Sequence, residues 1–452
     1  MPLINKTIAM QQHRRIVTIA LVALSLVYIL KFYPISRNQI SLPWDQQDVL
    51  NSTLGFEKIF VINLPSRRDR RDAMAMAGVV SNLNLTFIEG LTGSSTLPRG
   101  EKVIMHQVSA GTDPSHSPAA GARGSWASHV SALQRIVDLG LGSALVLEDD
   151  VDWDVRLKMQ METFAAASRM WLDVEKQKRR ATSRLLRDSE TARPQRPRSI
   201  VAASSSKTGS KDARNGLLGK RESEHDSTIP LPQQDLLTSS DRHYKSRARS
   251  LYGDDWDVLW LGHCGADLPG HEPPPSSSPP CASSLKISIP NDKTVPAPKH
   301  LRPHPFALRD ALADAVPPHT RVVHAACGNA CSLAYAVSHR GARKLLRLFT
   351  TDGFASQWDL MLRDYCAGFE GERLVCLTVQ PPLFSHHYGG EGGRGGGASV
   401  SDIRGQGGGF AGGRKGTPYV RLSVQENLER LVAGFSVDEL VDQLPDDGDT
   451  LW

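Results

Sequence analysis

The residues best suited to chemistry form one run of acids behind a short apolar segment. Residues 144–147 are apolar without interruption, and carboxylates follow at once: Glu148, Asp149, Asp150, Asp152 and Asp154. Carboxylates are too costly to bury unpaired, so these must face solvent, a cation or both. Oxygen ligands of this kind suit Mg²⁺ or Mn²⁺, which complete their shells with water and substrate phosphates. We therefore predict that Asp150 and Asp152 hold a metal, with Glu148 or Asp149 nearby.

A second interpretation gives these acids a purely structural task. Asp152 or Asp154 could cap the helix that is expected to begin near Val155. The context favours the metal, because an apolar strand followed by acids places them where open α/β sheets bind ligands. Both roles can coexist.

A cluster of cations follows an earlier apolar strand. The strand is predicted over residues 58–64 with Asn63 near its end, and four arginines follow it: Arg67, Arg68, Arg70 and Arg71. A Ser66-x-x-Asp69 capping box would begin the next helix there. Arginines at a helix start oppose its dipole, so they are either solvated surface or an anion-binding site. We expect Asn63, Arg67 and Arg70 to bind a nucleotide.

Three further polar positions have open roles. Asp359, in Gln-Trp-Asp, is either the cap of a helix or a general base. His386, with His387 beside it, is either a metal ligand or a loop residue, and we assign His386 to the metal. His129 lies beside the apolar stripe of a predicted helix, and we expect it to be a core histidine.

These residues must be positioned by alternating strands and helices. Strands are predicted over residues 58–64, 85–89, 144–147, 256–261, 332–337 and 374–379. Helices are predicted over residues 66–78, 125–139 and 155–174, after Ser338, from Gln357 and over 424–432. This order predicts an α/β fold with a mixed, mostly parallel sheet flanked by helices.

The first segments of the chain predict a membrane anchor. Residues 16–35 are largely apolar behind a basic flank, which is typical of an uncleaved signal anchor. Residues 1–15 would then be a cytoplasmic tail, and residues 36–55 a lumenal stem. This topology is single-pass type II, in the membrane of the Golgi or the endoplasmic reticulum. The sequences Asn51-Ser52-Thr53 and Asn84-Leu85-Thr86 would be glycosylation sequons.

The remaining segments are defined by composition. The catalytic domain is predicted over residues 56–388, with disordered insertions at 176–250 and 269–305. A Gly-rich loop follows at 389–416, and a helix with a frayed acidic tail at 417–452. The net charge of +5 comes from residues 176–250, which hold 18 Lys and Arg against 8 Asp and Glu. Because that segment is not expected to fold, we exclude nucleic acid as a partner.

All six cysteines lie after residue 260, and none form a Cys-x-x-Cys pair. This favours disulfides over a zinc site if the compartment is oxidising. Cys366 and Cys376 are expected to pair, because they flank one helix-to-strand turn. Cys264 is expected to pair with Cys327 or Cys331, which leaves Cys281 as the residue without a partner.

Six blocks, in this order, resemble glycosyltransferase family 25, the lipopolysaccharide-type and collagen-type galactosyltransferases. They begin with Phe60-Val-Ile-Asn-Leu-Pro-Ser-Arg-Arg-Asp-Arg-Arg71, Gly124-Ser-Trp-Ala-Ser-His-Val-Ser-Ala132 and Leu145-Val-Leu-Glu-Asp-Asp-Val151. They continue with Trp256-Asp-Val-Leu-Trp-Leu-Gly262, Ala334-Tyr-Ala-Val-Ser-His-Arg-Gly-Ala-Arg-Lys-Leu-Leu346, and Trp358-Asp359 with Gln380-Pro-Pro-Leu383. The blocks cover about half of the chain. Bacterial relatives typically have Gly-Cys before the Ser-His pair, where this chain has Ser125-Trp126-Ala127.

The resemblance implies a GT-A-like fold, a UDP-sugar donor, Mn²⁺ or Mg²⁺, and inversion at the anomeric carbon. The function predicted is transfer of a sugar, galactose by the resemblance, to a glycan or glycoprotein acceptor in the secretory pathway. Two alternatives stay open. One is a non-catalytic membrane-anchored protein with a degenerate transferase domain, and the other is a metal-dependent phosphohydrolase.

Overall fold

The structure is a computed structural model, and it describes residues 49–93, 118–191, 227–232, 250–271, 281–368, 374–389 and 415–452. These residues all belong to one compact unit, Gln46–Trp452. Within them, no helix combines the length and the apolar character needed to cross a membrane. The predicted anchor at residues 16–35 lies outside the described residues, as does most of the Gly-rich loop.

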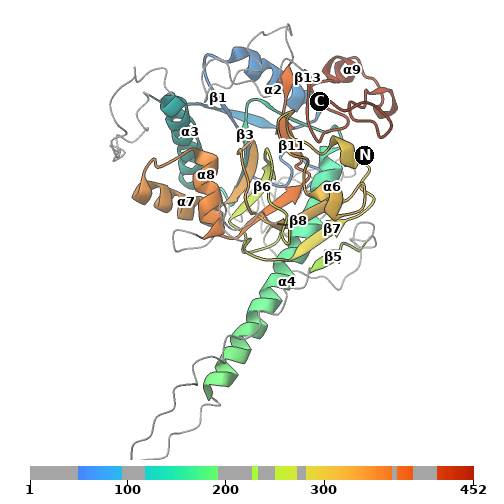
Figure 1. The fold of residues 1–452 in the computed structure, drawn as a ribbon. Helices are drawn as coiled ribbons and strands as arrows, with labels where there is room; N and C mark the ends of the chain where they lie inside the picture. Colours follow the sequence, from blue (N-terminus) through green and yellow to red (C-terminus); the bar gives the residue numbers. More distant parts are fainter. Residues whose placement is uncertain are drawn as a thin grey trace, which may run out of the picture. The chain divides into compact units, whose positions relative to one another are not determined.

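A mixed sheet forms the centre of this unit (Figure 1). Its strands are β1 (Lys58–Asn63), β2 (Leu85–Glu89), β3 (Ser143–Glu148), β4 (Val151–Trp153), β5 (Thr228–Pro230), β6 (Val258–Gly262), β7 (Lys286–Ile289), β8 (Arg321–Ala325), β9 (Ala334–Ser338), β10 (Cys376–Gln380) and β11 (Phe384–His386). Two short strands, β12 (Tyr388–Gly389) and β13 (Lys415–Gly416), pair separately. The order along the sheet is β2-β1-β3-β9-β6-β10-β8-β7-β5, and β4 and β11 branch from it.

The direction of the strands decides where a site can form. β1 pairs in parallel with both β2 and β3, and β6 pairs in parallel with β10. β9 is antiparallel to both β3 and β6, so those two strands run the same way. The carboxyl ends of β1, β2, β3, β6 and β10 therefore meet at one edge, which we call the carboxyl edge. The predicted acids and Asn63 all follow or end strands at this edge.

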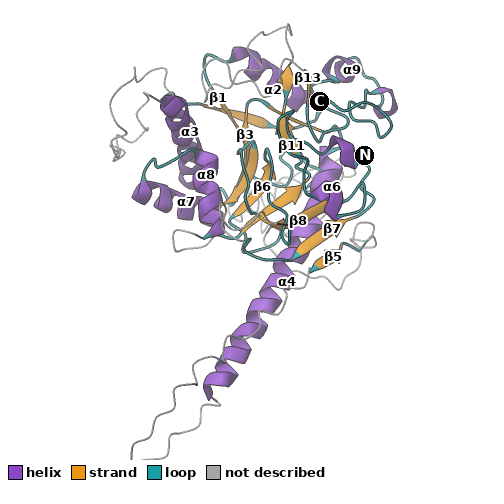
Figure 2. Ribbon diagram, in the orientation of Figure 1, coloured by secondary structure: helices purple, strands orange, loops and turns teal. Residues whose placement is uncertain are grey.

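Helices cover both faces of the sheet (Figure 2). They are α2 (Arg68–Val80), α3 (Pro118–Asp138), α4 (Leu157–Thr191), α6 (Leu312–Ala315), α7 (His339–Asp352), α8 (Trp358–Ala367) and α9 (Leu428–Val432). Apolar residues of α2 and α4 pack with alternate residues of β1 and β3, such as Ile59 and Leu145. Their neighbours Phe60 and Val146 face α3, α7 and α8 instead. This alternation on two buried faces explains the continuous apolar pattern of β3 and confirms the α/β class.

Of the two helix caps predicted from the sequence at Ser338 and Ser66, the structure confirms the one at Ser338. Ser338 caps α7, because its hydroxyl accepts a hydrogen bond from the backbone N–H of Gly341 at 3.0 Å. The capping box predicted at Ser66 is wrong, since α2 begins after Arg67 without a side-chain cap. Asp69 is held instead by Arg67, whose Nη2 lies 2.8 Å away.

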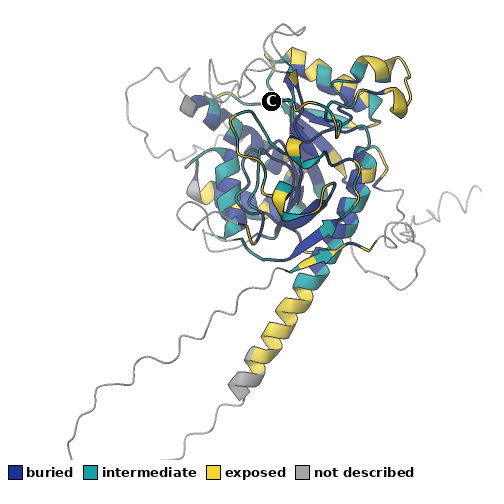
Figure 3. Ribbon diagram, turned by 45° about the vertical axis from the view of Figure 1, so that its right-hand side comes forward, coloured by how far each residue is buried: buried dark blue, intermediate teal, exposed yellow. Residues whose placement is uncertain are grey.

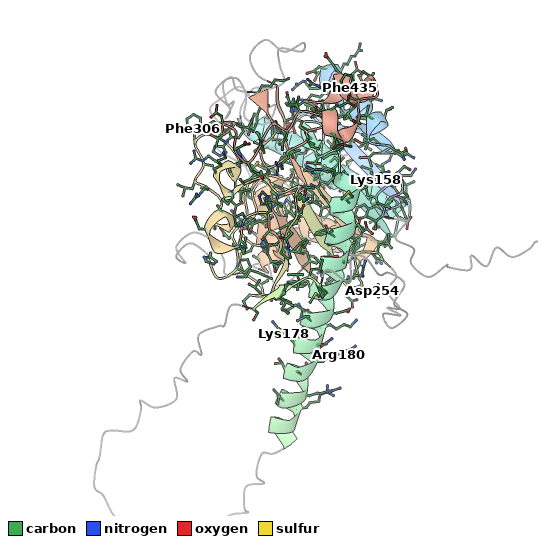
Figure 4. The ribbon with its side chains drawn as sticks, turned by 90° about the vertical axis from the view of Figure 1, so that its right-hand side faces the viewer. Lys158, Lys178, Arg180, Asp254, Phe306 and Phe435 are labelled. Carbon is green, nitrogen blue, oxygen red and sulfur yellow. A yellow bond between two sulfur atoms is a disulfide. The ribbon has the colours of Figure 1, made fainter. Side chains whose placement is uncertain are left out.

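The predicted insertions contain ordered structure. α4 continues to Thr191, and Figures 3 and 4 show its exposed last part, with Lys178 and Arg180, extending away from the sheet. β5 lies inside the segment predicted as 176–250, and β7 lies inside 269–305. The two strands pair in parallel and extend the sheet at its end. They are too short for a period-two pattern to be visible in the sequence.

The C-terminal segment is also folded, contrary to the frayed tail predicted for it. Leu444 is buried, and Arg421 pairs with Asp442 at 2.7 Å and with Asp446 at 3.2 Å. The acidic residues therefore have a partner that the sequence pattern did not indicate. α9 is shorter than predicted, and Leu431 packs against the same core as α2.

Three disulfides join segments of the second half of the chain. Cys366 pairs with Cys376, and Cys264 pairs with Cys331, as predicted. The expectation for Cys281 is wrong, because it pairs with Cys327. The prediction relied on the position of Cys281 in a proline-rich segment, which does not indicate which residues lie near it in the fold. The Cα atoms of Cys281 and Cys327 lie 5.1 Å apart.

Candidate active site

The acid cluster lies at the carboxyl edge, where the chain leaves β3. Glu148 ends this strand, Asp149 and Asp150 form the turn, and β4 begins at Val151. The apolar residues of β3 are fully buried between the two helical layers, whereas the three acids are partly exposed. A buried strand thus carries three carboxylates to the surface at the position that the sequence predicted.

Arg70 on α2 connects two of these acids. Its Nη1 donates hydrogen bonds to Oδ1 of Asp149 and to Oδ2 of Asp150, both at 2.9 Å. Asn63, at the end of β1, donates from Nδ2 to Oδ2 of Asp149 at 2.8 Å. All three of these pairs link residues more than 70 positions apart in the chain. The structure therefore brings together Asn63, Arg70, Asp149 and Asp150, as expected from the parallel order of β1 and β3.

The two carboxylates that share this arginine have different pKa values. Burial and the adjacent charge of Asp150 together raise the pKa of Asp149 to about 6, although Arg70 and Asn63 both lower it. Burial also disfavours the charged form of Asp150, but Arg70 and His386 outweigh it and hold the pKa of this group below its usual range. Two like charges this close are expected to separate in this way. At neutral pH Asp150 is the firmly ionised member of the pair.

His386 approaches Asp150 from β11. This strand pairs antiparallel with β4, with His386 opposite Val151, and it places Nε2 of the histidine 3.4 Å from Oδ2 of Asp150. Burial lowers the pKa of His386, but the Asp150 carboxylate more than compensates and raises it overall. The imidazole ring stacks on Tyr388, with ring centroids 4.5 Å apart. The predicted partner from the C-terminal side of the domain is therefore in contact with the acid cluster.

Asp152 has a different environment from Asp150. It lies in the middle of β4, is fully buried, and has neighbours Val151 and Trp153 in the apolar core. Side chains alternate along a strand, so the Asp152 carboxylate points to the opposite side, toward the C-terminal segment. Thr417 donates its hydroxyl to Oδ2 at 2.6 Å, and Ser423 donates to the same oxygen. The other oxygen accepts backbone N–H groups from Trp153 at 2.8 Å and Gln425 at 3.2 Å.

Asp154 has a structural role at the start of α4, which was the alternative to metal binding for this cluster. Its carboxylate accepts two hydrogen bonds from the guanidinium of Arg156, at 2.7 and 2.8 Å, and one from the backbone N–H of Arg156. It also accepts the backbone N–H of Leu422 at 3.1 Å. Asp154 therefore fixes both the approach to α4 and the C-terminal segment.

These environments decide which residues fit a divalent cation. Oδ1 of Asp150 and Nδ1 of His386 are buried atoms with no hydrogen-bond partner among the residues that the structure describes. A carboxylate oxygen without a partner suits Mn²⁺ or Mg²⁺. The ring nitrogen of His386 that faces Asp150 is Nε2, on the other side of the ring from the unpartnered Nδ1. Asp152 does not fit, because four donors already occupy its two oxygens. The described part of the chain contains no group of three His, Cys, Asp or Glu side chains arranged around one metal.

Glu148 faces the other side of the cluster. Its Oε1 accepts a hydrogen bond from Ser332 Oγ at 2.9 Å and lies 3.6 Å from Nε2 of His129. His129 is 2% exposed, contacts the Tyr335 hydroxyl at 3.0 Å through Nδ1, and stacks on Trp358 at 4.7 Å. His129 is thus the core histidine that the sequence predicted. Nothing in the sequence pattern indicated that His129 and Ser332 both contact Glu148.

Asp359 lies in the first turn of α8, next to Trp358. Its Oδ2 accepts the backbone N–H of Cys331 at 2.8 Å. Cys331 is joined to Cys264 by a disulfide and precedes Ser332, which contacts Glu148. Asp359 is therefore attached to the same loop that borders the acid cluster. Gln357, and not Asp359, is the residue at the helix cap.

Arg67 lies beside the cluster but is directed along its own helix. Its Nε and Nη2 donate to the two oxygens of Asp69 at 3.0 and 2.8 Å. Its charge nevertheless contributes, after Arg70 and His386, to the low pKa of Asp150. Of the four arginines, Arg70 is buried by the acids, whereas Arg68 and Arg71 are exposed. Arg67 and Arg70 are therefore the two arginines of the run whose charge acts on the acid cluster.

Comparison with known proteins identifies a related family. Residues 56–199 match the family model described as glycosyltransferase family 25 (LPS biosynthesis protein). Procollagen galactosyltransferase 2 of Homo sapiens is 31% identical over 111 residues, and procollagen galactosyltransferase 1 of Danio rerio is 30% identical over 112 residues. Each alignment covers 24% of this chain and 18% of the relative. The chain thus aligns with about a fifth of the length of these relatives.

Proposed function

We propose that this chain, which carries a glycosyltransferase family 25 domain in residues 56–199, is a metal-dependent inverting galactosyltransferase. The observation that supports it most is the Glu148-Asp149-Asp150 turn at the carboxyl edge, linked to Arg70 and His386. The printed names of the relatives, which are procollagen galactosyltransferases, support galactose as the sugar and a glycoprotein as the acceptor. The donor is a UDP-sugar.

The nucleotide is held on the α2 side of the cluster. Arg70 and Arg67 supply positive charge for the diphosphate, and Arg70 is already directed to the turn that receives it. Asn63 and Asp149 supply an amide and a carboxylate, which can hydrogen-bond the polar groups of a nucleoside. Glu148, which accepts a hydrogen bond from Ser332, lies at the same edge, and we assign it to the sugar of the donor.

Asp150 and His386 are the residues that hold a divalent cation in this proposal. When bound, the cation neutralises the charge that develops on the leaving diphosphate. Asp150 is suited to this role because it is ionised and one of its oxygens has no hydrogen-bond partner among the described residues. Tyr388 keeps the ring of His386 in position by stacking on it.

The acceptor side is provided by α8 and the loop of Cys331. We assign Asp359 as the general base that takes the proton from the acceptor hydroxyl. As that proton leaves, the acceptor oxygen forms a bond to the anomeric carbon and the bond from this carbon to the diphosphate oxygen breaks. One displacement inverts the configuration. The hydrogen bond from Cys331 fixes the direction of the Asp359 side chain.

The compartment proposed is the secretory pathway. The three disulfides fit an oxidising lumen, since cytosolic proteins rarely contain structural disulfides. The apolar segment at residues 16–35 serves as a type II anchor in the endoplasmic reticulum or the Golgi. The transferase domain then lies in the lumen with its glycoprotein acceptor.

A product assay with radiolabelled UDP-galactose tests the function. The purified domain is incubated with and without Mn²⁺, and with and without a panel of glycoprotein acceptors. Transfer into acceptor that stops after chelation and is restored by Mn²⁺ is expected. Release of UMP and galactose 1-phosphate would identify a phosphohydrolase instead. Donor binding without turnover on any acceptor would identify a degenerate transferase domain, and the Asp150→Asn variant controls for contaminating activity.

A further inference from the structure

We propose that Asn51 and Asn84 carry N-linked glycans, and that this glycan pair shields the exposed edge of the sheet at β2. The inference rests on the lumenal location proposed above, and it concerns a modification site remote from the transfer chemistry. Both asparagines begin Asn-x-Thr sequences, Asn51–Thr53 and Asn84–Thr86. Both are exposed in the structure.

The conformation of Asn51 is compatible with a glycan. Its Oδ1 accepts hydrogen bonds from the backbone N–H of Thr53 at 2.8 Å, from the Thr53 hydroxyl at 3.1 Å and from the backbone N–H of Gly55 at 3.0 Å. These bonds use the side-chain oxygen and hold it toward the turn. The amide nitrogen, which would carry the glycan, takes part in none of them. A glycan on Nδ2 therefore leaves the turn intact.

Asn84 lies beside this turn. Its backbone N–H donates to the carbonyl of Ser52 at 2.7 Å, so the two sequons are in direct contact. Asn84 immediately precedes β2, which is the first strand in the order of the sheet and pairs only with β1 among the strands that the structure describes. An edge strand exposes unpaired backbone groups that can pair with another chain. A bulky, solvated glycan at the start of this strand obstructs such pairing.

The position also keeps the glycans away from the proposed active site. β1 and β2 are parallel, with Ile59 opposite Leu85 and Asn63 opposite Glu89. The sequons lie at the amino end of β2, whereas Asn63 and the acid cluster lie at the carboxyl edge. Leu85 and Glu89 lie four residue steps apart along the strand, or roughly 13 Å at about 3.3 Å per step. Occupancy and transfer activity should therefore be independent.

The modification uses a lipid-linked oligosaccharide diphosphate, the class of donor that supplies such glycans in the secretory pathway. Nδ2 of the asparagine forms a bond to C1 of the first sugar, and the bond from C1 to the phosphate oxygen breaks. One amide proton is lost, and the lipid diphosphate leaves. No oxidant or reductant is needed.

The occupancy is tested on the full chain, expressed in a mammalian secretory host with an added reporter sequon in a C-terminal tag. Glycosidase treatment and intact mass should show glycans at both sites and at the reporter. Thr53→Ala and Thr86→Ala should each remove one glycan, while Thr53→Ser and Thr86→Ser should keep it. Asn5-Lys6-Thr7, before the apolar segment, should stay unmodified. Mass spectrometry of the peptides assigns each site.

Two outcomes would overturn the inference in distinguishable ways. A glycosylated reporter with Asn51 or Asn84 unmodified would refute the glycan pair and leave the lumenal location of the proposed function intact. An unmodified reporter would refute the lumenal location together with the glycans. Neither outcome bears on whether the domain transfers galactose in the product assay.

The shielding role is tested with two variants of the same exposed residue. Asn84→Gln removes the glycan and adds no charge, so it should increase the aggregated fraction of secreted protein several-fold. Asn84→Lys also removes the glycan but places a lysine, the charge that natural edge strands use, at the start of β2. It should restore the soluble fraction. Equal solubility of Asn84→Gln and the wild type, or equal aggregation of the two variants, would contradict the shielding role.

Discussion

The guanidinium of Arg70 donates a hydrogen bond to the Asp150 carboxylate at 2.9 Å, across 80 residues of sequence. This pair joins the first helix of the domain to the turn after β3. The same nitrogen serves Asp149, so one cation is shared by two acids. The arrangement stabilises the two clustered carboxylates, and Arg70 is the cation that the proposed function assigns to the diphosphate of the donor.

Asp150→Asn should abolish transfer without unfolding the domain. The asparagine removes one of two like charges, and Arg70 keeps Asp149 as its partner, so the melting temperature without ligands should change by only a few degrees. Loss of an ionised ligand at a developing charge should lower kcat by roughly 100-fold or more. Thermal shifts with Mn²⁺ and UDP-galactose should disappear. Metal-dependent transfer near the wild-type rate would show that the cluster has no catalytic role.

Asp152→Ala, unlike Asp150→Asn, should destabilise the folded domain. The substitution leaves four buried donors without their acceptor, including the hydroxyls of Thr417 and Ser423. Loss of this buried carboxyl group, which leaves its hydrogen-bond donors unsatisfied, should lower the free energy of unfolding by about 3 kcal/mol or more. Urea unfolding measures this, with Asp150→Asn as the matched control. If the variant keeps its stability but no longer binds Mn²⁺, Asp152 is a metal ligand after all.

Asp359→Asn tests whether Asp359 is a general base or only a structural hydrogen-bond acceptor for the backbone N–H of Cys331. The asparagine retains an oxygen that can accept the N–H of Cys331 but cannot take a proton. We expect kcat to fall by about 100-fold, with the KM for donor and the melting temperature close to wild type. Asp359→Ala should lose stability as well. An active Asp359→Asn enzyme beside an unstable Asp359→Ala protein would identify Asp359 as an anchor only.

Two buried histidines should make the domain sensitive to mild acid. Nε2 of His263 donates to the carbonyl of Val379 and Nδ1 accepts the N–H of Gly265, so the ring is neutral. Burial lowers the pKa of His263 and of His324 to about 4. The unfolded chain binds these protons near pH 6.5, so stability is complete above that pH and falls as the pH drops toward 4.

At pH 5 each histidine should cost about 2 kcal/mol of stability relative to pH 7.5. Denaturant unfolding at a series of pH values gives the slope. His324→Gln should make the slope shallower between pH 6.5 and 5, whatever its effect at pH 7.5. A slope identical to that of the wild type would show that His324 does not titrate on unfolding.

The disulfide between Cys281 and Cys327 should contribute stability that reduction removes. It closes a loop of 46 residues, for which chain entropy predicts about 4 kcal/mol at most. A Cys281→Ser/Cys327→Ser double variant should unfold at lower denaturant, and Cys366→Ser/Cys376→Ser, with a shorter loop, should lose less. Peptide mapping without reduction should recover Cys281 bonded to Cys327. A bond from Cys264 to Cys327 would contradict this connectivity.

The sequence alone determined the part of the site that depends on local pattern and strand direction. A short continuous apolar run followed by acids is typical of a buried strand that ends at a ligand-binding edge, and β3 confirms that prediction. The predicted order of strands and helices placed Asn63 and the acids at strand ends, and the parallel pairing of β1 and β3 brings those ends to one edge. The α/β class follows from the same alternation of strands and helices.

Tertiary structure decided the features that depend on distant partners. Asp152 is spaced correctly for a metal, yet its environment is set by Thr417 and Ser423, more than 260 residues away. β5 and β7 are ordered because they pair with each other at the end of the sheet, not because of their own three or four residues. The partner of Cys281 was likewise fixed by a distance of 5.1 Å in space. These features depend on the free energy of contacts between residues far apart in the sequence. A short stretch of sequence cannot predict such contacts.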